Sequence, residues 1–272
     1  MTTDVFVTTK NRPDLLRESL ESFRKNTVPG ECRLTVVRDG DFVVTDHVLR
    51  DFTDIVDFVL TSRDNRGLGP AINMALAHID SLKRWDGDSD SLTVYVQDDV
   101  LYSDGWLSRL AGPYCKFYGT LGLGFASGVE CVEHPVRRAL GAGIVLKDWI
   151  RATCMMAMHS YWMSMWPISR IDPETGRERG RPNDGLGSSV DWWFIRNHPN
   201  SVCKTGRTNL VIPGLLKHAG YDRSTWLSRE LPESQADMEA IAAARPRVDA
   251  LPDEVMKIIR EPGTYSVTTG DL

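Results

Sequence analysis

The sequence lacks the cysteine pattern of a disulfide scaffold or a zinc-binding protein. Its 272 residues include five cysteines, which are scattered and form no C-x-x-C pair. Secreted disulfide frameworks and structural zinc sites use an even set of cysteines or closely spaced pairs. We therefore expect a protein of the reducing cytoplasm.

Apolar runs long enough for a membrane are also missing. No stretch of about 18 consecutive apolar residues occurs, which is the length that a membrane-spanning helix requires. Residues 1–13 contain no basic region followed by a long apolar segment, the pattern of a signal peptide. From these absences we expect neither a membrane span nor a signal peptide.

An excess of positive charge is absent as well. Lysine and arginine number 32 against 37 aspartates and glutamates, which gives a net charge of −5. This balance argues against a protein that coats nucleic acid, although a local basic patch is compatible with it. Two G-x-G stretches, at 122–124 and 141–143, lack the full G-x-G-x-x-G pattern, so we expect no nicotinamide cofactor.

What the sequence does contain is an alternation of strand and helix patterns over its first hundred residues. The apolar spacing predicts strands at 5–9, 34–37, 55–60 and 92–96, and helices at 13–26, 43–52 and 67–82. Such alternation is typical of an α/β fold with a mostly parallel central sheet flanked by helices. Beyond residue 103 the pattern is less regular, and the methionine-rich stretch after residue 154 favours core packing.

Polar side chains follow each of the four predicted strands. They are Thr8, Thr9 and Arg12 after the first, Asp39 and Asp41 after the second, Asp64, Asn65 and Arg66 after the third, and Asp98 and Asp99 after the fourth. Ligands of open α/β sheets bind beyond the carboxyl ends of the strands. This convergence predicts a functional site at that edge of the sheet.

The adjacent carboxylates Asp98 and Asp99 are candidate metal ligands. Two such groups directly after an apolar strand repel each other unless a cation compensates them, and oxygen ligands of this kind suit Mg²⁺ or Mn²⁺ bound with substrate phosphates. The alternative reading is a pair of solvated turn residues.

Four segments of the first 110 residues carry a resemblance to a known family. They are TTKNRPDLLRESLESF, VVRDGD, DNRGLGPAINMAL and VYVQDDVLYSDGWLSRL, and two shorter segments follow, VDWWFIRN at 190–197 and KHAGYDRST at 217–225. In this order they resemble the GT-A fold glycosyltransferases, most of all the inverting family 2. The resemblance implies one catalytic domain over 1–260, with a nucleotide-sugar half at 1–110, an acceptor half at 111–260 and a flexible tail at 261–272.

The resemblance also implies a binding site for a sugar nucleotide. The residues that it assigns to this site are Thr8, Thr9, Arg12, Asp39, Asn65, Arg66, Gly67 and Asp98. Asp39 would accept a hydrogen bond from a uracil ring, which favours a UDP-sugar, and Arg66 would reach the diphosphate. Gly67 allows a close approach of the backbone.

The metal ligands implied by the resemblance are Asp99 and His218, with Mn²⁺ or Mg²⁺ as the ion. Gln97 stands where a strict D-x-D motif has its first acidic residue, so the division of roles between Asp98 and Asp99 stays open. For His218 a contact with the diphosphate, or a purely structural hydrogen bond, is an alternative.

Asp191 occupies the place where this family usually has its catalytic base. Such a base takes the proton of an acceptor hydroxyl as its oxygen attacks the sugar. Asp184 is the rival base, and Trp192, Trp193 and Trp226 are candidates for an acceptor platform.

The acceptor itself is not readable from the sequence. A glycan, a lipid-linked sugar, a small molecule or a protein are all compatible with it. A hydroxymethylated DNA base, as used by some viral glycosyltransferases, is another option, because the arginine-rich loop at 170–181 and the pair Trp192 and Trp193 suit a flipped base. A non-catalytic module that binds sugar nucleotides or glycans is the alternative to an enzyme. A nucleotidyltransferase is disfavoured because TTKNRPD lacks the glycine-rich basic loop of that class.

Overall fold

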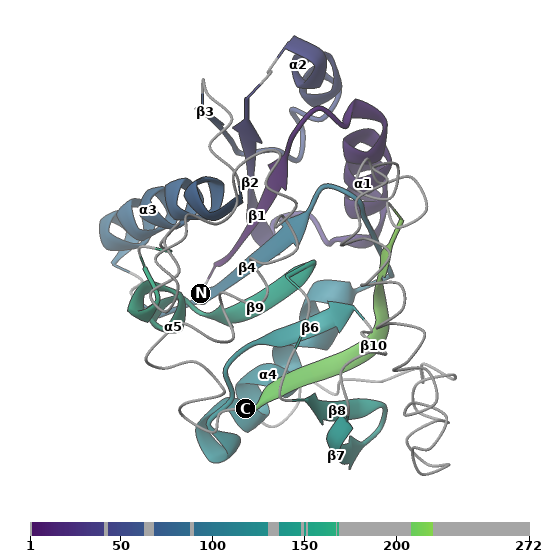
Figure 1. The fold of residues 1–272 in the computed structure, drawn as a ribbon, viewed down its shortest axis with the longest axis vertical. Coiled ribbons are helices and arrows are strands. Elements are labelled where there is room, and N and C mark those ends of the chain that lie inside the picture. Colours follow the sequence, from purple (N-terminus) through teal and green to yellow (C-terminus); the bar gives the residue numbers. More distant parts are fainter. Residues whose placement is uncertain are drawn as a thin grey trace, which may run out of the picture.

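Four strands form the N-terminal half of the sheet. They are β1 (Thr3–Thr9), β2 (Cys32–Asp39), β3 (Phe58–Ser62) and β4 (Leu92–Gln97). β1 pairs in parallel with both β2 and β4, and β2 pairs in parallel with β3 (Figure 1). The parallel sheet predicted from the strand and helix alternation is therefore confirmed here. These statements come from a computed structural model that describes residues 2–40, 43–62, 68–87, 90–129, 136–147, 150, 152–166, 168 and 208–219.

One predicted strand begins later than expected. The apolar residues Ile55 and Val56 suggested a strand from 55 to 60, but β3 begins at Phe58. The backbone N–H groups of Ile55 and Val56 both donate to the carbonyl of Phe52, at 3.1 and 2.9 Å. These two residues therefore close a turn, and their side chains pack against the core from outside the sheet.

Helices connect the strands and cover the sheet. They are α1 (Pro13–Asn26), α2 (Val43–Arg50), α3 (Leu68–Asp86), α4 (Trp106–Leu121) and α5 (His159–Ser164). α1 has the bounds that the sequence predicted, because Pro13 suits the first helical turn and Thr27 returns to an extended backbone. Its apolar stripe, which includes Leu16, Leu20 and Phe23, is buried.

The second half of the sheet is mainly antiparallel. It contains β5 (Val100–Tyr102), β6 (Ala126–Val129), β7 (Val136–Gly141), β8 (Ile144–Lys147), β9 (Cys154–Met158) and β10 (Asn209–His218). The strand order is β3-β2-β1-β4-β9-β6-β10-β8-β7, and β5 pairs with β10. In this half β6 and β10 run parallel, and the other pairings are antiparallel.

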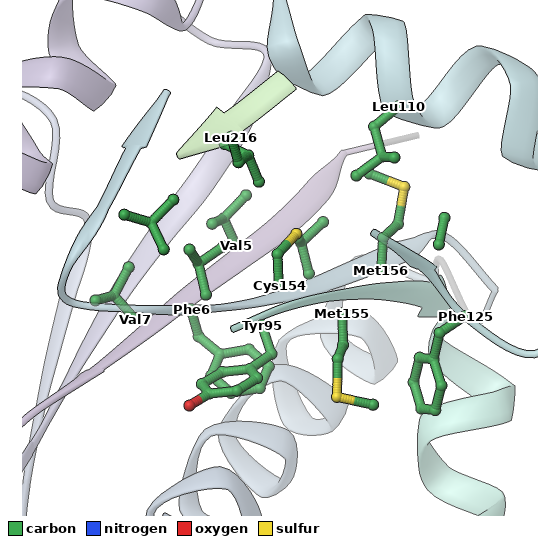
Figure 2. Close-up of a cluster of buried hydrophobic side chains, with 14 of the residues drawn as sticks. Val5, Phe6, Val7, Tyr95, Leu110, Phe125, Cys154, Met155, Met156 and Leu216 are labelled. Atoms are coloured by element: carbon green, nitrogen blue, oxygen red, sulfur yellow. The ribbon is translucent and has the colours of Figure 1, made fainter. Parts of the chain in front are cut away.

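The core lies on both faces of the central strands. Successive side chains alternate between the faces, as the pleat of a strand requires. Figure 2 shows Val5 and Met156 on the face that Leu110 of α4 covers, with Phe6 and Met155 on the opposite face. The methionine-rich stretch thus begins with the buried strand β9 and continues through α5, in agreement with the predicted core packing.

Taken together, the described residues form a mixed α/β domain. β1, β2 and β4 lie side by side in parallel, so their carboxyl ends meet at one edge of the sheet. Among the described residues there is no helix with the length and apolar character needed to cross a membrane.

Candidate active site

Two buried carboxylates lie at the carboxyl end of β4. Asp98 and Asp99 form the connection between β4 and β5, and their side chains are 0% and 2% exposed. The reading of this pair as solvated turn residues is therefore wrong. A buried charge is costly unless it is paired and hydrogen-bonded, so the neighbours of this pair determine what it does.

Thr9 and Arg12 supply most of the hydrogen bonds and positive charge that offset the burial of Asp98 and Asp99. The hydroxyl of Thr9 donates to Oδ2 of Asp98 at 2.7 Å. Nη1 of Arg12 donates to Oδ2 of Asp99 at 2.7 Å, while Nη2 donates to Oδ1 of Asp98. A single guanidinium thus bridges both carboxylates, which uses the fork geometry that lysine lacks.

A tight turn after β1 brings Arg12 to this position. Asn11 has a φ of 50°, in the left-handed region that asparagine tolerates better than most residues. Arg12 then begins α1 as its N-cap, with Pro13 directly after it. The side chain of Arg12 is 24% exposed, so it borders solvent while its charged end reaches the carboxylates.

His218 reaches the pair from the far end of the chain. β10 runs antiparallel to β5 and sets His218 opposite Val100. The backbone N–H of Ala219 also donates to the carbonyl of Asp99, at 2.7 Å. Nε2 of His218 consequently lies 3.2 Å from Oδ1 of Asp99. The structure brings together two residues that are more than a hundred positions apart in the sequence.

The two carboxylates differ in their pKa values. Burial is the largest influence on Asp98 and raises its pKa to about 6, even though the charge of Arg12 opposes that shift. Burial also raises the pKa of Asp99, but the interactions with His218 and Arg12 outweigh it and hold that pKa below its usual value. Burial lowers the pKa of Arg12, but the charges of Asp98 and Asp99 prevail and raise it overall. Arg12 therefore keeps its charge.

Asp39 and Thr8 complete the polar edge. Asp39 is the last residue of β2, is buried, and lies opposite Ser62 of β3. Gly40 follows with a φ of 102°, a conformation that glycine adopts without a steric penalty. The hydroxyl of Thr8 lies 3.2 Å from that of Tyr95 in β4. Sequence reasoning did not single out Tyr95, although a tyrosine among the β-branched residues of a buried strand was a signal for a polar contact.

The remaining residues assigned by the resemblance lie outside the described residues. This applies to Asn65, Arg66, Gly67, Asp191 and the rival base Asp184. It also applies to Trp192, Trp193 and Trp226. Their roles stay predictions.

Asp99 and His218 have the separation expected of two metal ligands. Neighbouring ligand atoms of an octahedral ion bound at about 2.1 Å lie about 3 Å apart, and here Oδ1 of Asp99 and Nε2 of His218 are 3.2 Å apart. Both oxygens of Asp98 already accept hydrogen bonds from Thr9 and Arg12. Across the described ranges no cluster of three or more His, Cys, Asp or Glu side chains is arranged for a metal. The site therefore fits an ion that takes few protein ligands and completes its shell with phosphates and water, as Mg²⁺ and Mn²⁺ do.

A family profile matches most of the described residues. Residues 4–163 match the family described as Glycosyl transferase family 2, and this range is more than half of the 272 residues. A comparison with curated protein sequences finds no match.

One solved structure with a similar fold is a mannosyltransferase, and structures of S. aureus TarS match with lower TM-scores. The mannosyltransferase PcManGT of Pyrobaculum calidifontis, solved with GDP-mannose and Mn²⁺, has 16% identity and a TM-score of 0.52, over 95% of this chain and 68% of its own. S. aureus TarS 1–349 has 16% identity and a TM-score of 0.40, over 59% of this chain and 48% of its own. The same fragment in complex with UDP has 19% identity and a TM-score of 0.37, over 52% and 38%.

Proposed function

This chain belongs to glycosyl transferase family 2, and from that membership we propose that it transfers a sugar from a UDP-sugar to an acceptor hydroxyl with the help of Mn²⁺ or Mg²⁺. The observation that supports this most is the meeting of Arg12, Asp99 and His218 at the carboxyl edge of the sheet. These residues come from the turn after β1, the end of β4 and the end of β10. An anionic donor and a cation would both find partners there.

The donor would bind across the carboxyl ends of β1, β2 and β4. In this proposal Asp39 accepts a hydrogen bond from the base, and Thr8, Thr9, Asn65, Arg66 and Gly67 surround the rest of the nucleotide. The single N–H of uracil suits one carboxylate, and this favours UDP. Guanine also presents N–H donors, and the similarly folded PcManGT was solved with GDP-mannose, so GDP is the competitor to test.

Asp99 and His218 would hold the divalent ion. When bound, the ion would offset the negative charge that builds up on the leaving diphosphate. Before the ion binds, Arg12 and Thr9 keep Asp98 and Asp99 oriented, since they bond three of the four carboxylate oxygens.

Asp191 would act as the base and give an inverting reaction. It would take the proton of the acceptor hydroxyl while that oxygen attacks the anomeric carbon from the side opposite the diphosphate. Asp191→Asn should abolish transfer while leaving UDP binding intact, and Asp184→Asn is the matched comparison. Wild-type turnover in Asp191→Asn, with loss in Asp184→Asn, would move the role of base to Asp184.

A nucleotide panel tests the donor site directly. The thermal unfolding midpoint of the protein would be measured with UDP, GDP, dTDP and CMP, each with and without Mn²⁺, because a ligand of the folded state raises it. We expect the largest rise with UDP plus Mn²⁺ and its loss in Asp99→Asn. The control Asp104→Asn removes an exposed carboxylate five positions further along the chain and should respond like the wild type.

The other outcomes of the panel are equally informative. A larger rise with GDP would overturn the choice of UDP and the role of Asp39. Equal rises with and without Mn²⁺ would overturn the metal requirement. Binding of UDP without sugar transfer to glycan, lipid-linked, small-molecule or hydroxymethylated DNA acceptors would favour a non-catalytic binding module.

A further inference from the structure

We infer that Arg12 is an internal counter-cation that a divalent ion has to displace from Asp99. This inference rests on the proposed metal dependence and adds a competitor for the metal that belongs to the chain itself. It follows from how the four oxygens of Asp98 and Asp99 are shared among their neighbours.

Three of the four carboxylate oxygens accept a hydrogen bond, and the fourth, Oδ1 of Asp99, lies 3.2 Å from Nε2 of His218. Arg12 donates to Oδ1 of Asp98 and to Oδ2 of Asp99. Thr9 donates to Oδ2 of Asp98, and His218 lies next to Oδ1 of Asp99. The guanidinium is therefore in the middle of the pair, and it satisfies the charge requirement that an ion would otherwise meet. Arg12 thus gives the buried pair a counter-cation that belongs to the chain itself.

An ion between Asp99 and His218 would compete with Arg12 for the same carboxylate. The two positive groups would lie on the two oxygens of one side chain, where their repulsion is strong because the pair is buried. Asp98 offers the ion no oxygen without a hydrogen bond, since both of its oxygens already accept hydrogen bonds from Thr9 and Arg12. Binding of the ion therefore requires Arg12 to weaken or leave its bond with Asp99.

The position of Arg12 allows such a departure. Its side chain is 24% exposed, whereas Asp98 and Asp99 are 0% and 2% exposed. It follows a turn with a left-handed residue, Asn11, rather than lying inside a helix or strand. The guanidinium has a route to solvent, or to an anionic ligand at the edge, without repacking of the core.

A simpler role would have the opposite consequence. If Arg12 only oriented the carboxylates for the metal, its removal would weaken metal binding. If it competes with the metal, its removal strengthens metal binding in the absence of nucleotide. The sign of the change distinguishes the two roles.

The test is a titration of nucleotide-free protein with Mn²⁺, in which the electron paramagnetic resonance signal reports free Mn²⁺. We expect Arg12→Gln to bind Mn²⁺ at least about tenfold more tightly than the wild type, because a neighbouring positive charge is removed. Arg12→Lys keeps the charge and should stay closer to the wild type than to Arg12→Gln. Arg17→Gln removes an exposed arginine from α1 and should leave the affinity unchanged. Equal or weaker binding by folded Arg12→Gln would overturn the inference.

A second pair of variants covers the case in which Arg12→Gln fails to fold. Asp98 would be left buried without its cation, and Asp98→Asn removes that charge. In the Asp98→Asn background, adding Arg12→Gln should again tighten Mn²⁺ binding through Asp99 and His218. No tightening in this background would count against the inference as directly as in the single variant.

The outcomes also separate this inference from the proposed function. If wild-type protein with UDP binds no Mn²⁺, the proposed metal dependence and the inference both fail. If it binds Mn²⁺ with UDP but Arg12→Gln shows no gain without nucleotide, only the competing role of Arg12 fails. If Arg12→Gln gains Mn²⁺ affinity while no nucleotide binds, the inference stands and the proposed donor fails.

Discussion

The central strands carry charged clusters at both ends, and the two clusters differ in how their charge is balanced. At the carboxyl edge, the two carboxylates Asp98 and Asp99 share the guanidinium of Arg12. At the amino edge, Asp4 lies between the ammonium of Lys83 and the guanidinium of Arg33. Both clusters contain buried carboxylates. Only the cluster at the carboxyl edge has more carboxylates than lysine and arginine side chains to balance them.

The amino-edge cluster consists of Asp4, Arg33, Lys83 and Asp86. Nζ of Lys83 lies 2.8 Å from Oδ2 of Asp4, and Nε of Arg33 donates to Oδ1 of Asp4 at 2.8 Å. Arg33 also pairs with Asp86. Two acidic and two basic side chains thus neutralise one another, with Lys83 and Asp4 almost fully buried. Such a cluster holds β1, β2 and α3 together and leaves no charge for a ligand.

Burial of charge does not by itself identify a functional site. A balanced cluster is structural, and removing one member leaves an uncompensated buried charge. A cluster with surplus negative charge, at the edge where parallel strands end, favours a cation from outside. The following experiments test whether the two ends of the sheet divide stability and function in this way.

The largest effect is expected from Asp99→Asn at the carboxyl edge. The loss of a metal ligand should lower kcat/KM for transfer by at least about 1,000-fold, equivalent to about 4 kcal/mol of transition-state stabilisation. The fold should persist, because the neutral amide still accepts hydrogen bonds. Steady-state kinetics and circular dichroism are the measurements, and near-normal turnover would remove Asp99 from the mechanism.

Lys83→Met should lower stability and leave the nucleotide site intact, the opposite of what is expected for Asp99→Asn. Removal of one partner from the buried amino-edge cluster should lower the free energy of unfolding by about 3 to 5 kcal/mol, while nucleotide binding persists. Denaturant unfolding measures the loss. The control Arg84→Met changes the next residue, whose side chain is 79% exposed, and should cost less than about 1 kcal/mol. Lost nucleotide binding in folded Lys83→Met would contradict the division of roles.

The raised pKa of Asp98 predicts a pH dependence at the carboxyl edge. Its pKa is about 6 in the folded state against 3.8 for the free side chain, so the folded state holds the proton more tightly between these values. The stability that Asp98 contributes is therefore greatest below about pH 4, and up to about 3 kcal/mol is lost as the pH rises through 6.

Asp98→Asn provides the matched measurement of this effect, because the amide does not titrate. The free energy of unfolding of the wild type minus that of Asp98→Asn should fall between about pH 4 and about pH 7. The lowered pKa of Asp99 acts in the opposite sense, but only at pH values below this window. A difference that stays constant across the window would contradict the raised pKa of Asp98.

The smallest effects are expected from two threonines at opposite ends of the sheet. Thr9→Val removes a hydrogen bond to the carboxylate of Asp98 and should cost about 2 kcal/mol of unfolding free energy. Thr93→Val removes the bond with Nδ1 of His159, 3.0 Å long, and should cost about 1 kcal/mol. Only Thr9→Val should also change the pH dependence that Asp98 causes. If both variants changed it equally, the two edges would not be electrostatically separate.

Much of the parallel half of the fold was predictable from local patterns. α1 begins and ends at the predicted residues because a proline start and an apolar stripe are local signals. The Asp98–Asp99 pair was recognisable as a candidate site, because two adjacent carboxylates directly after an apolar strand repel each other unless a cation compensates them. The start of β3 was predicted three residues too early, because Ile55 and Val56 are apolar but close a turn. Apolar character alone does not distinguish such a turn from a strand.

The partners of the carboxylates were harder to predict. The family resemblance assigned Arg12 to the nucleotide pocket, and that role stays a prediction, but nothing in the sequence indicated that its guanidinium bridges Asp98 and Asp99. The amino-edge cluster has no recognisable sequence pattern, because Asp4 and Lys83 are 79 positions apart (83 − 4). Taken alone, each of these residues would be expected at the protein surface. Such pairings depend on which strands become neighbours.

Local sequence patterns were enough to predict an α/β domain whose parallel strands end in polar residues, two of them adjacent carboxylates. These features follow from side-chain periodicity and from the direction of the chain, which are local properties. By contrast, the bridge from Arg12 to both carboxylates and the approach of His218 on β10 to Asp99 are visible only in the folded chain. The reason is that the charge balance of a buried group depends on every element packed around it, including strands distant in sequence.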